Sequence, residues 1–247
     1  MKTLKSKKLI VSGVAVVLVL ALSFVGVFIY ASDYYRANES FIDAFAEQYS
    51  VEKHSIEGGC AYGSTQSSVG FIFYPGGKVE YTAYEPLMIK LSSIGVFCVL
   101  LEMPLNLAVL DINAADGVRE KYPDIERWYI GGHSLGGAMA ASYLSKHASD
   151  FEGLVLLGAY STADLSSMEL DVLCLHGTED KVMDREKHDK YIVNLPNDFV
   201  EKEIEGGCHA FFGAYGAQDG DGDPTITLEE QITITANCIF ELILKGE

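Results

Sequence analysis

Basic residues are scarce in this sequence. Its 247 residues include 18 Lys and Arg against 35 Asp and Glu, which gives a formal net charge of −17 at pH 7. The first eight positions hold four of the basic residues and no acid, so the rest of the chain is more acidic still (Lys2, Lys5, Lys7 and Lys8). An acidic surface repels phosphate backbones, and we therefore expect no nucleic-acid partner.

The sequence also lacks the cysteine spacing of metal and redox sites. Its five cysteines include no C-x-x-C pair, and we expect no metal and no cofactor on this pattern. Cys98, Cys174 and Cys238 lie in apolar runs, where cysteine is usually a small buried hydrophobe. Cys60 and Cys208 fall in loops and would be able to pair in an oxidising compartment, a question that the sequence leaves open.

One long run lacks charge altogether, LIVSGVAVVLVLALSFVGVFIYA from Leu9 to Ala31. It is long enough to cross a bilayer as one tilted helix, and the lysines before it predict a cytoplasmic N-terminus. A cleaved signal peptide has an apolar stretch of only about 7–15 residues and a small-x-small site, whereas Ile29 stands where a small residue is needed. An uncleaved signal anchor is therefore favoured over a secreted protein, and both place the following domain outside the cytoplasm.

These features divide the chain into four segments: a basic cytoplasmic segment (1–8), a transmembrane signal anchor (9–31), an amphipathic linker helix (32–50) and one α/β domain (51–247). In the linker, apolar residues at helical spacing predict a helix that packs on the following domain (Phe41, Ile42, Phe45 and Tyr49).

Short apolar runs alternate with helical patterns after residue 51. Six runs read as strands: 69–74, 96–101, 128–131, 154–158, 172–176 and 200–204. Four longer segments read as helices: 83–94, 107–122, 135–147 and 228–244. Apolar strands separated by helices predict a mostly parallel sheet with helices on both faces. Only about ten residues lie between the runs that end at 158 and begin at 172, which leaves no room for a helical cap domain.

The stretch YIGGHSLGGAMA (129–140) packs four glycines around one serine. No lysine follows these glycines, which excludes a phosphate-binding loop, and their spacing does not fit the dinucleotide fingerprint. Gly132-x-Ser134-x-Gly136 fits a nucleophile elbow, in which a strand, a strained turn at the serine and a helix follow one another. Ser134 is the predicted nucleophile.

A serine nucleophile needs a base and an orienting acid, which follow it in the order acid and then histidine. The later histidines are His147, His176, His188 and His209. His209, in the late loop GGCHAFFG, is favoured as the base, while His188 in DREKHDK is expected on a solvated helix face. Among Glu179, Asp180 and Asp184, we favour Asp180 as the acid, and Asp184 is expected to cap the next helix.

The oxyanion hole is predicted from two backbone N–H groups. One belongs to Leu135, the residue after the nucleophile, and the other to the loop FIFYPGGKVE, where Gly77 is favoured and Lys78 is the alternative. Without a cap the substrate pocket is expected to be shallow, with walls from four side chains (Met103, Tyr160, Phe211 and Tyr215).

The sequence resembles the α/β-hydrolase superfamily in four motifs, which occur in the order YPGG, GGHSLGG, GTEDKV and GGCHAFFG. The runs MPLNLAV, YPDIERWYIGGHSLGGAMAA and DGDGDPTIT narrow the resemblance to small, often membrane-anchored bacterial α/β hydrolases related to dienelactone-hydrolase-like esterases. The resemblance implies Ser134, Asp180 and His209 as nucleophile, acid and base. Cys208 departs from it, because a polar, asparagine-like residue would often precede the histidine.

The run GAQDGDGDPTITLEE looks like a calcium loop, with Asp219, Asp221, Asp223 and Glu230 at ligand positions. Pro224 stands where the loop needs glycine, however, and no helix precedes it. An acidic turn that caps the last helix near Thr227 is favoured.

The sequence thus predicts a membrane-tethered serine hydrolase that cleaves a small ester or thioester. Two alternatives remain: a peptidase or acyltransferase on the same triad, and a catalytically silent binding domain.

Overall fold

A computed structural model describes residues 18–23 and 25–245 and divides into two units, 1–34 and 35–247. In the first unit, residues 18–23 and 25–32 are helical. No helix among the described residues combines the length and the apolar character needed to cross a membrane. Residues 9–17 and 24 of the proposed anchor lie outside the described part, and the anchor stays a prediction.

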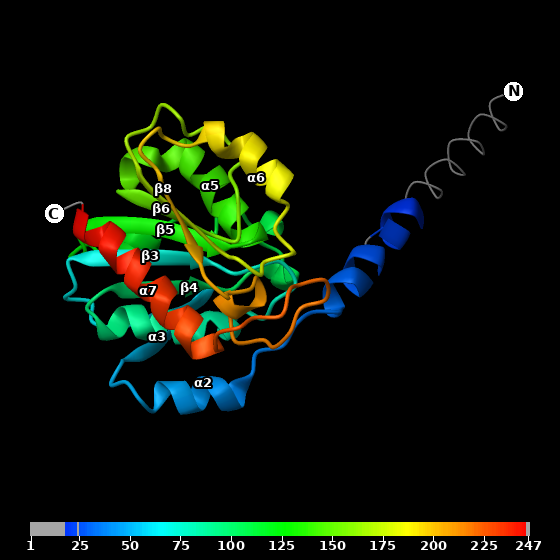
Figure 1. Ribbon diagram of the computed structural model, residues 1–247, viewed down its shortest axis with the longest axis horizontal. Coiled ribbons are helices and arrows are strands. Elements are labelled where there is room, and N and C mark those ends of the chain that lie inside the picture. The colour runs from blue at the N-terminus through cyan, green and yellow to red at the C-terminus, as the bar shows by residue number, and fades with distance from the viewer. Residues whose placement is uncertain (1–17, 24, 246–247) are drawn as a thin grey trace, which may run out of the picture. The chain divides into compact units, whose positions relative to one another are not determined.

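The second unit is built around one eight-stranded sheet (Figure 1). Its strands are β1 (Lys53–Ile56), β2 (Gly59–Tyr62), β3 (Val69–Tyr74), β4 (Phe97–Leu101), β5 (Arg127–His133), β6 (Gly153–Leu157), β7 (Asp171–Gly177) and β8 (Val200–Ile204), in the spatial order β1-β2-β4-β3-β5-β6-β7-β8. The first two form an antiparallel hairpin, β2 pairs antiparallel with β4, and all other pairs are parallel. The predicted α/β class with a mostly parallel sheet is confirmed.

Helices cover both faces of the sheet. The α-helices are α2 (Glu39–Ala46), α3 (Glu85–Ser93), α4 (Val118–Lys121), α5 (Leu135–His147), α6 (Arg185–Tyr191) and α7 (Leu228–Lys245). Single 3₁₀ turns are η1 (Tyr81–Tyr84), η2 (Pro104–Asn106), η3 (Ala108–Leu110), η4 (Ala148–Asp150), η5 (Ile192–Asn194) and η6 (Ala210–Phe212). In Figure 1, α3 and α7 lie on one face, while α5 and α6 lie on the other. Each face has its own buried apolar cluster, because β3, β4 and β6 are buried along their whole length.

Two parts of the sheet's surroundings differ from the sequence prediction. The helix predicted over 107–122 is wrong: only η3 and α4 form there, separated by turns. Asp and Asn side chains in this segment favour turns over helix interiors, and α4 begins only after Gly117, whose φ is 73°. The hairpin β1–β2 is missing from the prediction because three of the four residues of β1 are exposed and show no apolar pattern.

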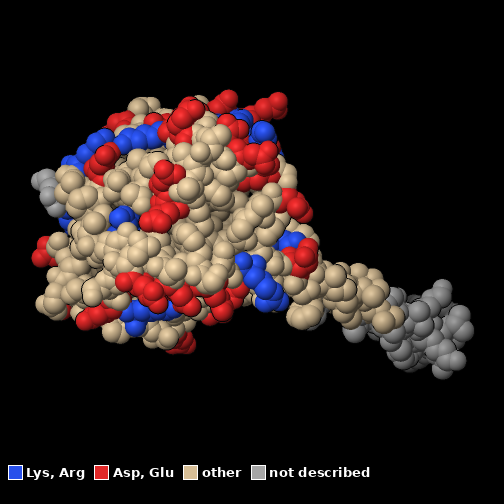
Figure 2. Space-filling model, turned by 60° about the horizontal axis from the view of Figure 1, so that its bottom comes forward, with Lys and Arg blue, Asp and Glu red and all other residues tan. Residues whose placement is uncertain are grey.

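Helix α2 belongs to the second unit and packs against α3. Asn38 caps its first turn by accepting a hydrogen bond from Phe41 N–H, and Ile42 and Phe45 are buried on its inner face. Between β6 and β7, residues 158–170 form no helix, so no cap domain is inserted there. Acidic side chains outnumber basic ones on the face in Figure 2, as the composition predicts.

Candidate active site

The predicted catalytic residues all follow the carboxyl ends of parallel strands. Ser134 follows β5, Asp180 lies just beyond β7, and His209 lies beyond β8. The loop that contains Gly77 follows β3, which is hydrogen-bonded to β5. Parallel strands place their carboxyl ends at one edge of a sheet, and this edge is where ligands bind in such folds.

Ser134 occupies a strained turn between β5 and α5. Its φ of 52° and ψ of −120° lie in a region that residues other than glycine rarely adopt. The serine N–H donates to Leu157 O on β6 at 2.9 Å, and its carbonyl accepts from Ala138 N–H as the helix begins. This backbone is the one expected of a nucleophile elbow, because it turns the serine side chain outward at the sheet edge.

The glycines two positions before and after the serine allow this turn to pack closely. A Cβ on Gly132 would lie 2.6 Å from Tyr74 O and from Gly136 C. A Cβ on Gly136 would collide with the carbonyl oxygens of Tyr74 and Pro75. The end of β3 therefore leaves no space for side chains at either position.

Asp180 and His209 form a buried pair. Nδ1 of His209 lies 2.8 Å from Oδ2 of Asp180, and the two side chains are 1% and 0% exposed. The other carboxylate oxygen accepts the backbone N–H groups of Val182 and Met183. Burial alone would raise the pKa of Asp180, but the bond from His209 and these two backbone donors outweigh it and hold the pKa below its usual value. An ionised Asp180 keeps a proton on Nδ1.

The opposite ring nitrogen of His209 is available as a base. Nε2 is buried and has no hydrogen-bond partner among the residues that the structure describes. The His209 ring packs on His133, the neighbour of Ser134, with ring centroids 4.3 Å apart. Gly158 lies against the Asp180–His209 pair, and it lines the same cavity as Ser134. The predicted acid, base and nucleophile thus gather around one place.

Two side chains hold the loop of His209, and the sequence analysis gave neither of them this role. Gln231, fully buried on α7, makes two hydrogen bonds to the backbone of Cys208, accepting from its N–H and donating to its carbonyl. Asp221 accepts the N–H of Ala210 at 2.8 Å with one oxygen and that of Lys181 at 3.3 Å with the other. Asp221 therefore ties the loop of the base to the loop of the acid.

Tyr84 and His133 form a second polar pair beside the elbow. The Tyr84 hydroxyl accepts Gly76 N–H at 3.1 Å and lies 2.8 Å from His133 Nδ1. Burial raises the pKa of Tyr84, which keeps the hydroxyl protonated, and the same burial together with His209 holds the pKa of His133 well below its usual value. The neutral His133 ring and the protonated Tyr84 hydroxyl are therefore joined by one hydrogen bond. No local pattern marks this contact, because Tyr84 in η1 and His133 at the end of β5 are far apart in the chain and meet only in the folded protein.

The two residues predicted to donate to the oxyanion, Gly77 and Leu135, lie next to each other. A Cβ on Gly77 would lie 2.9 Å from Leu135 Cδ2, so the two loops are in contact. Within the described part of the chain, neither the N–H of Gly77 nor that of Leu135 donates a hydrogen bond. Lys78, the alternative donor, instead gives its N–H to Asn106 O at 2.8 Å. The geometry favours Gly77 over Lys78.

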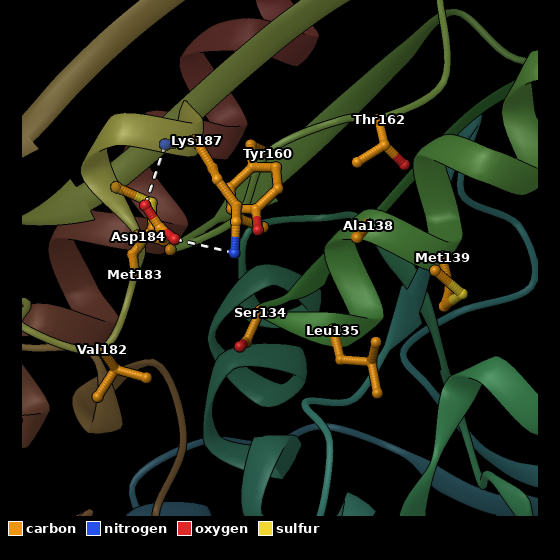
Figure 3. Close-up of a pocket in the computed structure, with 12 residues that line it drawn as sticks. Ser134, Leu135, Ala138, Met139, Tyr160, Thr162, Val182, Met183, Asp184 and Lys187 are labelled. Atoms are coloured by element: carbon orange, nitrogen blue, oxygen red, sulfur yellow. Dashed lines mark hydrogen bonds and ion pairs between the residues drawn. The ribbon is translucent and has the colours of Figure 1, made fainter. Parts of the chain in front are cut away.

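An open cavity of about 520 Å³ lies in front of Ser134 (Figure 3). Most of its lining residues are apolar, and the ion pair of Asp184 and Lys187, 2.9 Å apart, also lines it (Ser134, Leu135, Ala138, Met139, Gly158, Ala159, Tyr160, Thr162, Val182, Met183, Asp184 and Lys187). Asp184 also caps α6, as predicted, by accepting Lys187 N–H.

Of the four predicted pocket walls, only Tyr160 lines this cavity. Met103 is buried in the apolar cluster beneath the sheet edge. Tyr215 packs between Tyr35 and Tyr84, and Phe211 is half-buried against the cluster on the α7 side. Residues 182–184 and Met139 line the cavity in place of the other three predicted side chains (Figure 3).

The contacts of Cys60, Cys208 and the calcium-like loop answer the remaining questions that the sequence raised. Cys60 and Cys208 are free thiols, and burial together with Asp221 raises the pKa of Cys208 to about 12, so this thiol is uncharged beside the base. Among the described residues, the acids of the calcium-like loop do not gather as metal ligands. Thr227 Oγ1 instead accepts the N–H of Glu230 at 3.2 Å and caps α7, while Glu230 accepts the N–H of Thr227 at 2.7 Å, in agreement with the favoured interpretation.

Residues 70–233 match the family model of the α/β hydrolase family. The chain belongs to the α/β hydrolase family. A comparison with curated proteins finds no match. The matched range includes the strand–serine–helix elbow and the Asp180–His209 pair, and membership of the family supports a hydrolase.

Proposed function

We propose that the protein is a serine hydrolase of the carboxylesterase type, related to dienelactone-hydrolase-like esterases, with Ser134, Asp180 and His209 as its triad. The observation that carries the proposal is the buried Asp180–His209 pair, whose Nε2 has no partner among the described residues and whose ring packs on His133, the neighbour of the strained Ser134. Hydrolysis by such a site needs no cofactor.

In the acylation step, Ser134 Oγ attacks the carbonyl carbon of an ester or thioester. The Oγ proton passes to His209 Nε2, and Asp180 stabilises the imidazolium through Nδ1–H. The carbonyl electrons move to oxygen, where Leu135 N–H and Gly77 N–H donate to the negative charge. When the carbonyl re-forms, the bond to the alcohol or thiol breaks, and the leaving group takes the proton from Nε2.

Deacylation repeats these roles with water. Nε2 takes a proton from the water, whose oxygen attacks the acyl carbon, and the tetrahedral intermediate releases the carboxylic acid as Oγ recovers its proton. A cavity of about 520 Å³ with a mostly apolar lining favours a small acyl group, with Tyr160 as one wall.

A membrane location rests on the uncharged run 9–31 and the lysines before it. The α/β domain would then act outside the cytoplasm on small acyl substrates. The full chain should sediment with membranes and stay there at high pH, whereas a chain that starts at Ser32 should be soluble. Recovery of the full-length, uncleaved chain in the soluble fraction would contradict the anchor.

A fluorophosphonate probe tests the nucleophile. The full chain should be labelled and Ser134→Ala should not, whereas Ser145→Ala, on the same helix but outside the cavity, should be labelled like the parent. Undiminished labelling of Ser134→Ala would rule out the assignment.

A substrate panel separates the esterase from its alternatives. Short-chain acyl esters and thioesters should be hydrolysed faster than aminoacyl amides, and acyl transfer to added alcohols should stay slower than hydrolysis. Preference for the amides would favour a peptidase, and dominant transfer an acyltransferase. A folded chain that hydrolyses none of them and resists the probe would favour a binding domain.

A further inference from the structure

A cluster of buried histidines lies outside the cavity, between α6 and the edge of the sheet. His176 is on β7, His188 on α6 and Glu201 on the edge strand β8. The histidine side chains are 2% and 4% exposed, so the expectation that His188 lies on a solvated face is wrong. One carboxylate oxygen, Glu201 Oε1, lies 3.6 Å from His176 Nδ1 and 3.3 Å from His188 Nε2.

We propose that this cluster binds a divalent cation of the zinc type, with His176 Nδ1, His188 Nε2 and Glu201 Oε1 as its ligands. The three atoms lie within 4.8 Å of one another. In a tetrahedral zinc site with bonds of about 2.0–2.2 Å, neighbouring ligand atoms are about 3.4 Å apart. The two separations from Glu201 bracket this value, and the two histidine nitrogens are at most 4.8 Å apart.

Each histidine also has a carboxylate at its other ring nitrogen. Glu203 Oε1 lies 3.1 Å from His176 Nε2, and Asp189 Oδ1 lies 3.4 Å from His188 Nδ1. Carboxylates in these positions hold the ring protons on the outer nitrogens and direct the inner lone pairs toward a shared ion. Both inner nitrogens here face Glu201.

Arg185 competes with this arrangement. Its Nη1 lies 2.6 Å from His176 Nε2, and its Nη2 lies 3.3 Å from Glu203 Oε1. A guanidinium only donates, so when Arg185 bonds to His176 the ring proton sits on Nδ1, which then cannot bind a metal. For a metal to bind, this proton must move to Nε2, from which it is donated to Glu203. Arg185 then loses its bond to His176 and keeps only its contact with Glu203.

The donor set indicates the class of ion. Imidazole nitrogens with one carboxylate suit zinc and its transition-metal neighbours, whereas magnesium and calcium prefer sites made of oxygen alone. Three carboxylates and one guanidinium surround the histidines, which leaves negative charge for a divalent cation to offset (Glu201, Glu203, Asp189 and Arg185). The Glu201 side chain is 32% exposed, so an ion can enter from solvent and retain water as a further ligand.

The ion would join three elements, β7, α6 and β8. Helix α6 begins just after Asp184, which lines the cavity, and the loop of Asp180 precedes it. A cation at this place would hold α6 against the sheet and limit the motion of the acid-bearing loop. The site is distinct from the proposed serine chemistry and does not depend on it.

The test uses the full chain without an affinity tag, purified in detergent and stripped with a chelator. Calorimetric titration with zinc chloride should show one ion per chain, and zinc but not magnesium should raise the melting temperature. Glu203→Gln should weaken zinc binding by about 10- to 100-fold, and Glu201→Gln and His188→Gln by at least as much. His54→Gln removes an exposed histidine on β1 and should leave the affinity unchanged.

Arg185→Met should bind zinc more tightly than the parent, because the competing donor is gone. Failure of the stripped parent to bind zinc, or ligand variants that bind as it does, would overturn the proposal. If a ligand variant does not fold, Arg185→Met and Glu203→Gln decide the question. These two variants must shift the affinity in opposite directions, and unchanged affinity in both overturns the site.

Discussion

The hydroxyl of Tyr84 lies 2.8 Å from Nδ1 of His133, and both side chains are buried. Through Gly76 N–H this hydroxyl also holds the loop after β3, while the His133 ring packs on His209. The loop of the proposed oxyanion donor, the elbow and the proposed base are therefore connected by one tyrosine.

Replacing Tyr84 with Phe should leave Gly76 N–H and His133 Nδ1 without partners. We expect a loss of about 1–3 kcal/mol in the free energy of unfolding and a lower kcat with little change in KM, because the loop of Gly77 loses its support. Denaturant unfolding and ester hydrolysis measure the two effects. Tyr143→Phe removes a hydroxyl bond to Asp116 outside the cavity and is the matched control. An equal fall of kcat in both variants would show that the contact is not specific to the site.

The stability of the domain should depend on pH through His133. Because its folded-state pKa is held well below the usual 6.5, the unfolded chain takes up this proton first as the pH falls. The contribution of His133 is complete above about pH 6.5 and is lost progressively below it, with a slope of at most about 1.4 kcal/mol per pH unit. In His133→Gln, the free energy of unfolding should fall less steeply between about pH 7 and pH 5. Parallel curves for the two proteins would refute this role.

Asp180→Asn should lower kcat by about 10⁴-fold, because an amide facing His209 favours the ring tautomer whose lone pair is on Nδ1 instead of Nε2. The pKa of Asp180 is lower in the folded protein than its value of about 3.8 in the unfolded chain. Its carboxylate therefore stabilises the fold above about pH 3.8, and this stabilisation is lost as the pH falls through the folded-state pKa. Glu179→Gln changes the preceding acid and should keep nearly full activity. Steady-state kinetics at neutral pH compare the two, and comparable losses would reopen the choice of acid.

Asp221→Asn should loosen the loops of the acid and the base together. Asp221 accepts Ala210 N–H and Lys181 N–H through different oxygens, and an amide has only one oxygen to offer. We expect a loss of about 1.5–3 kcal/mol in the free energy of unfolding and a reduced kcat. The same substitution at the exposed Asp223 should have little effect. Calcium added to the chelator-stripped parent should not change its melting temperature; a clear rise with calcium would restore the calcium hypothesis.

Local patterns predicted the elements that are buried or capped. The strand 69–74 and the helix 135–147 have the predicted bounds, because an uninterrupted apolar run and a glycine-flanked serine followed by a helical segment leave few alternatives. The segment 107–122 misled the prediction because its spacing of apolar residues resembles a helix, whereas residues 112–117, which include Asn113 and Asp116, form turns. The exposed strand β1 carries no pattern of its own and exists through its pairing with β2.

The sequence by itself determined most of the buried strands, the elbow at Ser134 and the candidate acid and base, because these depend on local motifs and on the order of those motifs along the chain. Only the tertiary structure decided which distant side chains meet. It brought Tyr84 to His133, Asp221 to both loops, and His188 to Glu201. It also placed Val182 and Met183 in the cavity in positions assigned to more distant aromatic residues. Such contacts depend on how helices pack across a sheet, and no local spacing specifies that packing.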